Sequence, residues 1–243
     1  MDQAEFFDTL TRNEASHFWY RSRDRLLVWA LGAYFPEARR LLEIGCRAGN
    51  VLAAFGRAFP EVELIGSEIE PASVAAARAR LPRLSLVRAD ARHMPFAGRF
   101  DVVGMFDVLE HIDEDERVLQ ELFATTRPGG GVLLTVPQHP RLWSVVDTHS
   151  GHRRRYTRED IARKLARSGF TIVLMTSFVS LLLPLAWLSR IRQNRTGLDL
   201  DAELQLPRIV NGVLERVMTI ERWMIVNGVS LRAGLSLLVV ARR

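Results

Sequence analysis

The stretch LLEIGCRAGN, which spans Leu41 to Asn50, decides the fold class of this 243-residue chain. Its first residues form a short apolar run typical of a buried strand, and a helix-forming sequence follows from Val51. Between the two lie Gly45 and Gly49, which allow the chain to reverse tightly and let a ligand approach the backbone. Because such a turn lies at the carboxyl ends of the strands in an open α/β sheet, the stretch predicts a ligand site there.

Short apolar runs that recur along the chain predict further strands of the same sheet. The stretches between them have helical periodicity or helix-forming composition, and this alternation predicts a Rossmann-like, doubly wound and mostly parallel α/β sheet. The predicted strands are 41–44, 62–65, 84–87, 102–106 and 132–136, and the predicted helices between them are 51–59, 71–81 and 114–126. The sequence PGGG at 128–131 predicts a break before the fifth strand.

The pattern changes after the fifth strand. Thr157, with Asp160 three residues later, predicts the start of another helix. An 18-residue stretch without formal charge, 172–189, then has the length of a membrane span. Because Pro184 and several hydroxyl residues interrupt it, we expect instead a sixth strand over 171–178, a turn and a separate apolar helix. A last apolar run, 235–241, predicts a seventh strand.

These elements predict a core with two additions. The expected units are an N-terminal helical cap (1–37), the core (38–178), an apolar helical insertion (179–231) and the last strand of the core (232–243). In the insertion an apolar stripe recurs at helical spacing, at Ile209, Val213, Val217, Ile220 and Met224. A stripe of this width usually faces a core. The alternatives are a lid over the substrate, a dimer contact and a membrane-facing surface.

Composition limits the classes of function. The single cysteine excludes an intramolecular disulfide, and the polar, acidic start lacks a secretory signal, so we expect a cytoplasmic protein. The net charge of +5 comes almost entirely from arginines scattered among acids, since Lys164 is the only lysine. This distribution does not favour a nucleic-acid partner.

Acidic side chains at the predicted strand ends indicate the kind of ligand. Glu43 precedes the first turn, where a carboxylate would repel a pyrophosphate but attract a sulfonium or ammonium group. Glu68 follows Gly45 by 23 residues, about the spacing at which an acid reaches a ribose. Asp90 follows the third strand and is placed to accept from an adenine amine. Because the pattern G-x-G-x-x-G is also absent, an NAD-dependent oxidoreductase is disfavoured.

Five segments in this order carry a specific resemblance: EIGCRAG, IGSEIEP, RADARHMPF, FDVVGMFDVLEHI and RPGGGVLLTVP. Together they resemble the class I S-adenosylmethionine-dependent methyltransferases, and most closely the small-molecule enzymes of the ubiquinone and menaquinone group. The resemblance covers about residues 38–170, and the ending GLSLLVVARR looks like the antiparallel seventh strand of that family.

The resemblance implies the cofactor S-adenosylmethionine and a set of residues that hold it. The expected cofactor-binding residues are Glu43, Gly45, Cys46 and Gly49 near the methionine part, Glu68 and Ile69 near the ribose, Asp90 and Ala91 near the adenine, and Phe106 against the cofactor. Arg47 departs from the pattern, because the family often has glycine there. If that position needs a positive φ, an arginine costs about 1 kcal/mol or more.

Histidines near the expected methyl group are candidates for a general base. His111 follows the fourth strand, and a second group, His149, His152 and Tyr156, follows the fifth. The arginines 153–155 of the same loop could bind a phosphate or carboxylate, or form a solvated basic turn. A metal site of Asp107, Glu110 and His111 is an alternative, but we predict no bound metal.

The apolar insertion, the aromatic segment His17–Tyr34 and the basic loop together indicate the acceptor. We expect methyl transfer to a small, hydrophobic or lipid-linked molecule, with peripheral membrane contact or oligomerisation through residues 179–231. The alternative is a protein that binds the cofactor but acts as an inactive regulator or scaffold.

Overall fold

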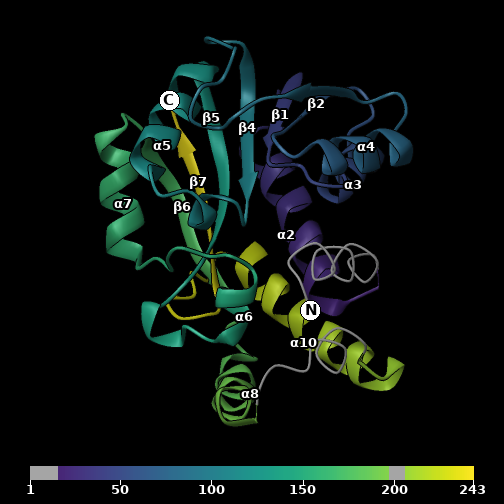
Figure 1. Ribbon diagram of the computed structural model, residues 1–243, viewed down its shortest axis with the longest axis vertical. Coiled ribbons are helices and arrows are strands. Elements are labelled where there is room, and N and C mark those ends of the chain that lie inside the picture. Colours follow the sequence, from purple (N-terminus) through teal and green to yellow (C-terminus); the bar gives the residue numbers. More distant parts are fainter. Residues whose placement is uncertain (1–15, 197–205) are drawn as a thin grey trace.

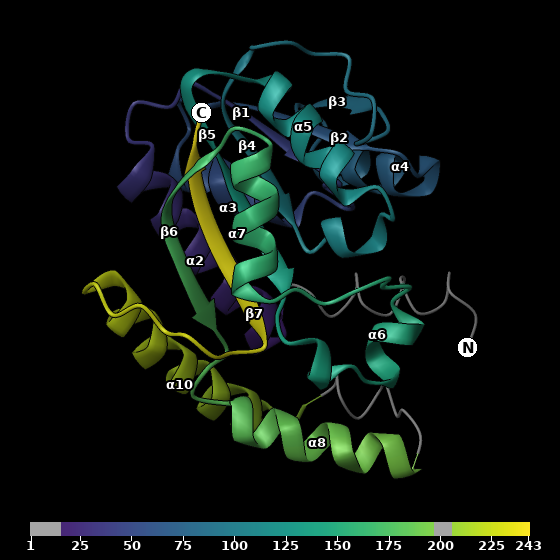
Figure 2. The same cartoon turned by 90° about the vertical axis from the view of Figure 1, so that its left-hand side faces the viewer.

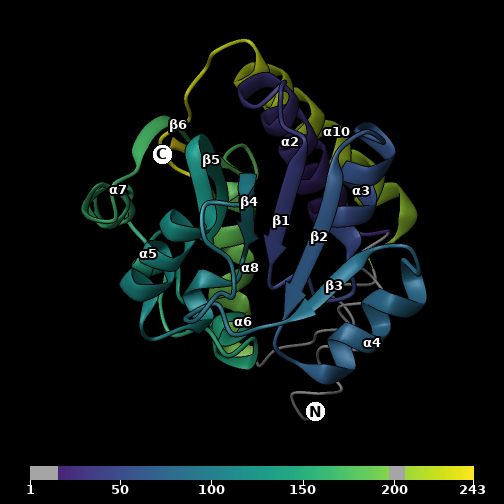
Figure 3. The same ribbon diagram turned by 90° about the horizontal axis from the view of Figure 1, so that it is seen from above.

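The computed structural model describes residues 16–196 and 206–243, and it describes the side chains of 16–190 and 206–243. Seven strands form one sheet in the order β3-β2-β1-β4-β5-β7-β6 (Figures 1 and 3). Their bounds are β1 Arg40–Ile44, β2 Glu63–Glu68, β3 Ser85–Arg88, β4 Phe100–Phe106, β5 Thr126–Pro137, β6 Thr171–Phe178 and β7 Ser236–Arg242. Only β7 runs antiparallel, to both β5 and β6. The predicted Rossmann-like sheet with an antiparallel last strand is confirmed.

Helices cover both faces of the sheet, as the apolar runs require. The bounds are α2 Phe18–Tyr34, α3 Asn50–Ala58, α4 Pro71–Arg80, α5 Asp115–Thr125, α6 Val145–His149, α7 Arg158–Arg167, α8 Leu183–Thr196 and α10 Arg208–Val226, with short 3₁₀ turns η1 Leu109–His111 and η2 Pro140–Leu142. One core forms where α5 and α7 pack on the sheet, and another where α2, α3 and α10 pack on its other face. Thr157 caps α7 as predicted, since its hydroxyl accepts from the Asp160 amide at 3.1 Å.

The glycine run lies within the bounds of β5, and the predicted break appears there as an interruption of the pairing with β4, although it does not precede the strand. Thr126 already pairs with Phe100, and the register shifts within the run before regular pairing begins at Gly131. A Cβ on Gly131 would lie 2.2 Å from the Ala241 carbonyl oxygen of β7. The glycines here permit close approach of two strands and do not end one.

The uncharged stretch folds as a strand, a turn and a helix. β6 has the expected bounds. After a turn, α8 begins at Leu183, and Pro184 is its second residue. Among the residues that the structure describes, no helix combines the length and the apolar content needed to cross a bilayer.

The apolar stripe of α10 faces outward over much of its length, contrary to the packing that such stripes usually adopt. Ile209, Ile220 and Trp223 are exposed, while the buried positions of the helix are Met218, Glu221 and Ile225. Glu221 fixes this orientation, because its carboxylate accepts from the amides of residues 179–181 at 2.6 to 2.8 Å. Periodicity could not reveal this, since the residue that anchors the helix is an acid.

The insertion lies at the end of the sheet to which the parallel strands point. Figures 1 and 2 show α6, α8 and α10 grouped there, beyond the carboxyl ends of β4 and β5. α10 also packs along α2, where Glu215 forms ion pairs with Arg21 and Arg25 at 3.2 and 2.6 Å. The first 15 residues of the expected N-terminal cap and part of the insertion (197–205) lie outside the described residues.

Candidate cofactor and acceptor site

The turn after β1 is held by backbone hydrogen bonds to the end of β2. The amides of Gly45 and Cys46 both donate to the Ser67 carbonyl, at 2.8 and 3.0 Å. Gly45, Arg47 and Gly49 all have positive φ, at 72°, 47° and 76°. A Cβ on Gly45 would lie 2.6 Å from Val108 Cγ2. Glycine is therefore required at Gly45 by both conformation and space, whereas Arg47 occupies the strained position that the sequence indicated.

Two buried carboxylates flank this turn. Glu43 is 3% exposed at the end of β1, and Glu68 is 7% exposed at the end of β2. Glu68 accepts from the Arg47 amide at 2.9 Å and from the amides of Ile69 and Glu70 at 2.7 and 3.1 Å. Glu68 thus links the two strand ends and stabilises the turn.

The remaining predicted cofactor residues lie around the same strand ends. Cys46 is buried, and burial with the charges of Glu43 and Glu68 raises the pKa of its thiol, which stays neutral. Asp90 follows β3 and binds Arg92 at 2.7 Å, and this hydrogen bond lowers the pKa of the carboxyl. The neighbouring residue Ala91 is buried and Ile69 is exposed. Phe106 packs edge-on against Phe55 with ring centroids 6.0 Å apart. Their contacts with a cofactor stay predictions.

The turn after β4 carries three ionisable residues with different surroundings. Asp107 has a φ of 54° and binds Arg23 of α2 at 2.9 Å. Glu110 is fully buried, and burial together with the charge of Asp107 raises its pKa well above the ordinary value. His111 is half-buried, and burial and the nearby charge of His152 lower its pKa to about 4. The turn therefore presents an imidazole that is neutral at neutral pH.

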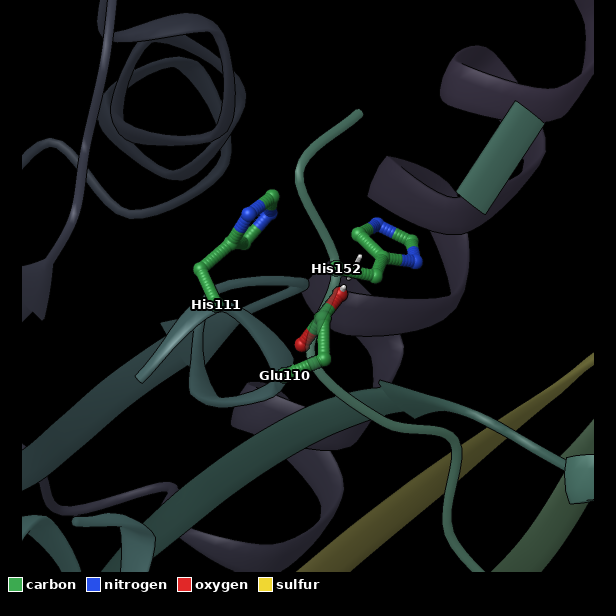
Figure 4. A group of neighbouring side chains, drawn as sticks. All are labelled: Glu110, His111 and His152. Carbon is green, nitrogen blue, oxygen red and sulfur yellow. Dashed lines mark ion pairs between the residues drawn. The ribbon is translucent and has the colours of Figure 1, made fainter. Parts of the chain in front are cut away.

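A side-chain network follows β5 and reaches this turn. Asp147 is fully buried; it accepts from the Ser144 amide at 2.8 Å and from Arg155 Nε at 2.7 Å, and it bonds His152 Nδ1 at 2.9 Å. His152 stands edge-on to His111, with ring centroids 4.8 Å apart. Figure 4 shows that His152 comes from a separate loop and meets Glu110 and His111 of the turn. The sequence did not assign Asp147 a role, although Ser144 and Asp147 form a capping box that marks it.

Two of the three arginines in this loop bind the protein's own acids, so neither of the two alternatives, anion binding or a solvated basic turn, describes them. Arg155 is buried against Asp147 and also donates to the Gln138 carbonyl at 3.0 Å. Arg154 pairs with the buried Asp115 at 2.9 Å. Arg153 is exposed, with its guanidinium 3.8 Å from Asp113. Of the three, only Arg153 faces solvent as an anion-binding side chain would.

The other two catalytic candidates lie apart from the histidine pair. Tyr156 is fully buried in the core and donates to Asp115 at 3.0 Å, and burial with the Asp115 charge raises its pKa. His149 is exposed at the end of α6, with Nδ1 2.9 Å from the Val145 carbonyl. The position of Tyr156 favours a structural role, and a catalytic role for His149 stays a prediction.

An apolar pocket opens beside these loops at the same edge of the sheet. Its volume is about 750 Å³, and it lies between η2 and the start of α8. Its lining includes His139, Pro140, Leu142, Leu183, Pro184 and Trp187. The insertion therefore contributes a wall to a cavity next to the carboxyl end of β5.

The strand order, the glycine turn after β1 and the acids at the ends of β1 and β2 define a Rossmann-like protein with a nucleoside cofactor site. The model of a methyltransferase domain family matches residues 12–174, and the chain belongs to this family. The predicted relationship to class I S-adenosylmethionine-dependent methyltransferases is confirmed, and S-adenosylmethionine is the cofactor of this family.

Curated relatives are similar in sequence to part of the chain. Trans-aconitate 2-methyltransferase from Methylobacterium radiotolerans is 36% identical over 104 residues, which are 42% of this chain and 40% of that protein. A probable S-adenosylmethionine-dependent methyltransferase from Mycolicibacterium smegmatis is 28% identical over 162 residues, 64% of this chain and 60% of that protein. The matched part thus spans about 40 to 60% of the length of these relatives.

Solved structures agree in fold at low identity. An S-adenosylmethionine-dependent methyltransferase from Mesorhizobium loti has a TM-score of 0.62 at 16% identity and covers 95% of this chain and 100% of its own. A phosphoethanolamine N-methyltransferase from Haemonchus contortus, in complex with S-adenosyl-L-methionine, has a TM-score of 0.60 at 18% identity, with 90% of this chain and 52% of its own covered.

Proposed function

We propose that this chain transfers the methyl group of S-adenosylmethionine to a small hydrophobic acceptor. The observation that carries the proposal is the cofactor turn, where two glycines with positive φ lie between the buried carboxylates Glu43 and Glu68. A cationic methionine end is favoured beside Glu43, and a ribose fits the acid at the end of β2. The bound cofactor supplies an electrophilic methyl group on a sulfonium.

The protein's own part in such a reaction is to position the acceptor and to accept its proton. His152 suits the second task, because Asp147 holds its Nδ1 and so directs Nε2 toward the space beside Glu110. His111 lies next to it as a neutral imidazole. The apolar pocket between η2 and α8 supports a hydrophobic acceptor, because its lining offers few polar partners.

Titration calorimetry with S-adenosylhomocysteine tests cofactor binding, and NAD serves as the control ligand. We expect binding of the first and none of the second. Tight NAD binding would overturn the proposal in favour of an oxidoreductase.

Turnover is tested by following labelled methyl groups from S-adenosylmethionine into the organic phase of a quinone and lipid extract. Labelled product supports methyltransferase activity. Cofactor binding without any labelled product supports the alternative, an inactive regulator or scaffold. Trp187→Ala is expected to raise the KM for an accepted substrate and leave the affinity for S-adenosylhomocysteine unchanged, because Trp187 lines the apolar pocket and lies on α8, far in sequence from the turn after β1.

A second observation favours contact with an anionic membrane surface. α8 and α10 expose Leu188, Ile209 and Trp223 at 62, 82 and 65%, and the exposed Arg208 and Arg216 lie on the same α10 helix. Apolar side chains interspersed with arginines suit an interface of acidic lipids. Both helices lie at the end of the molecule where the acceptor pocket opens (Figure 2).

Sedimentation with phosphatidylglycerol vesicles measures this contact. Trp223→Ser together with Ile209→Ser is expected to abolish co-sedimentation, whereas Val173→Ser, which removes a 45% exposed apolar side chain from β6, leaves it unchanged. The contrary result is that the unaltered protein fails to bind vesicles and forms a dimer in light scattering that the double variant does not form. That result would assign the exposed face to a dimer contact.

A further inference from the structure

Three ligand-type side chains from two separate segments converge beyond the carboxyl ends of β4 and β5. Glu110 and His111 belong to η1 after β4, and His152 belongs to the loop after α6. One donor atom from each lies within 4.8 Å of the other two, and His152 Nε2 is 3.9 Å from Glu110 Oε1 (Figure 4). The grouping depends on tertiary structure, since His152 follows His111 by 41 positions in the sequence.

Glu110 is the unusual member of this group. Its side chain is fully buried, yet within the described parts of the chain neither carboxylate oxygen has a hydrogen-bond partner. A buried carboxylate without a donor is costly, at about 1 to 3 kcal/mol or more, and native proteins rarely keep one. His152 at 3.9 Å is too distant for a hydrogen bond. The charge of Arg155 reaches Glu110, but none of the described residues donates a hydrogen bond to its two carboxylate oxygens.

The two histidines are oriented as metal ligands usually are. His152 is held through Nδ1 by the Asp147 carboxylate at 2.9 Å, which leaves Nε2 facing Glu110. His111 is held through its ring by the backbone carbonyl of Gly151. In metal sites, a histidine typically binds a carboxylate or a carbonyl through the nitrogen that does not face the ion. His152 has such a partner at Nδ1, and its Nε2 faces Glu110.

We propose that Glu110, His111 and His152 bind one divalent transition-metal ion of the zinc type. Two imidazole nitrogens and one carboxylate oxygen suit zinc and its neighbours, and leave a fourth position open. Magnesium and calcium prefer all-oxygen sites. Donors on one zinc ion lie about 3.4 to 4.2 Å apart, given bonds of about 2.1 Å, so small side-chain rotations complete the site from the present separations.

This donor set differs from the one considered from the sequence, which combined Asp107, Glu110 and His111, and from the prediction that no metal is bound. Asp107 is engaged by Arg23 of α2 at 2.9 Å, and His152 takes the third place. Binding of the ion does not require the proposed methyl transfer, but an ion on His152 Nε2 takes the place of the proton-accepting role proposed for that nitrogen. Only its use, to hold and polarise an acceptor oxygen, rests on that function.

Zinc titration of the full chain after chelator treatment, with a competing chromophoric chelator, tests the site. We expect one ion per chain, bound at least about 100-fold more weakly by Glu110→Gln and by His152→Asn, and about 10- to 100-fold more weakly by Asp147→Asn, which acts through His152. The matched controls are Glu116→Gln and His93→Asn, which alter exposed residues outside the cluster and leave the affinity unchanged.

The visible spectrum of bound Co²⁺ gives a second reading that does not depend on activity. The unaltered protein is expected to show the intense bands of a four-coordinate nitrogen and oxygen site, and His152→Asn to lose them while it retains the native circular dichroism. Equal zinc affinity in all variants, or saturation by Mg²⁺ in preference to Zn²⁺, would overturn the proposal. S-adenosylhomocysteine affinity, measured on the chelated protein, shows separately whether the proposed function holds.

Discussion

The proposed cofactor side and the proposed acceptor side of the sheet edge bury their charges by different means. On the cofactor side, the turn after β1 and the end of β2, the Glu68 carboxylate accepts from backbone amides of residues 47, 69 and 70. On the acceptor side, the turn after β4 and the loop after β5, Asp147 is neutralised mainly by side chains, namely Arg155 and His152. A site made from backbone is fixed by local chain geometry, whereas a side-chain site depends on which loops meet.

The strongest way to break the cofactor side is to place a side chain at Gly45. Gly45→Arg is expected to weaken S-adenosylhomocysteine binding by at least about 100-fold, because strain of about 1 to 3 kcal/mol adds to a clash with Val108. Titration calorimetry measures the loss. Gly98→Ala is the matched control, since Gly98 also has a positive φ but nothing lies within 4 Å of its added Cβ. Equal affinity in both variants would mean that the turn does not hold the cofactor.

On the acceptor side, we expect the largest loss of stability when a buried ion pair is broken. Asp147→Asn leaves the buried Arg155 guanidinium without its carboxylate, and breaking a buried pair of this kind costs about 3 to 5 kcal/mol. We expect a clear fall in Tm by calorimetry, with cofactor affinity of the folded protein unchanged. Asp113→Asn, at an acid whose side chain is 66% exposed, should leave Tm within error. If Asp147→Asn changes Tm only slightly, the ion pair with Arg155 is not what stabilises this loop.

The same contrast explains what the sequence could and could not predict. The strands and the turn after β1 follow from apolar runs and glycines, and Glu68 falls at a strand end that is fixed by alternation. By contrast, the meeting of Glu110 with His152 depends on the path of the loop after β5, which no local pattern determines. Arg154 and Arg155 appeared as a basic run, but their acids, Asp115 and Asp147, lie outside that run.

Helix orientation in the insertion was unpredictable for a related reason. Apolar side chains surround much of α10, so periodicity indicates a helix without selecting its buried face. The face is selected by Glu221, a buried acid that binds the backbone of the turn before α8. Likewise, the glycine run was predicted as a break and does interrupt the pairing of β5 with β4, but its close approach to β7 was not predictable, because β7 lies more than 100 residues later in the chain.

A smaller effect is expected behind the acceptor side, at Asp115. Burial raises the pKa of this carboxyl, but Lys164, Tyr156 and Arg154 outweigh burial and hold it below its ordinary value. A lowered pKa in the folded state stabilises the protein above about pH 4 and loses this effect as the pH falls through the folded-state value. Asp115→Asn should therefore lower the free energy of unfolding by about 2 kcal/mol at pH 7, with a smaller difference in acid.

Urea unfolding at several pH values measures this difference. Glu116→Gln alters the next residue of α5, whose ion pair with Arg167 is on the surface, and should change the free energy of unfolding little at any pH. If the difference in free energy of unfolding between Asp115→Asn and the unaltered protein stays constant down to acid pH, the effect of the substitution comes from lost hydrogen bonds alone.

The smallest expected effect returns to the cofactor side, at Arg47. Its φ of 47° is strained for an arginine, and a glycine there relieves about 1 kcal/mol. The contact that Arg47 itself makes with β2, its amide donating to the Glu68 carboxylate at 2.9 Å, comes from the backbone and is retained by glycine. Arg47→Gly should therefore bind S-adenosylhomocysteine as tightly as the unaltered chain or a few-fold more tightly, with a slightly raised Tm. Because the charge of Arg47 also reaches His111 and helps to lower its pKa, a tenfold loss of affinity would assign the side chain to the acceptor side. The two sides would then share a residue, and the division between a backbone-made and a side-chain-made half would not hold at this position.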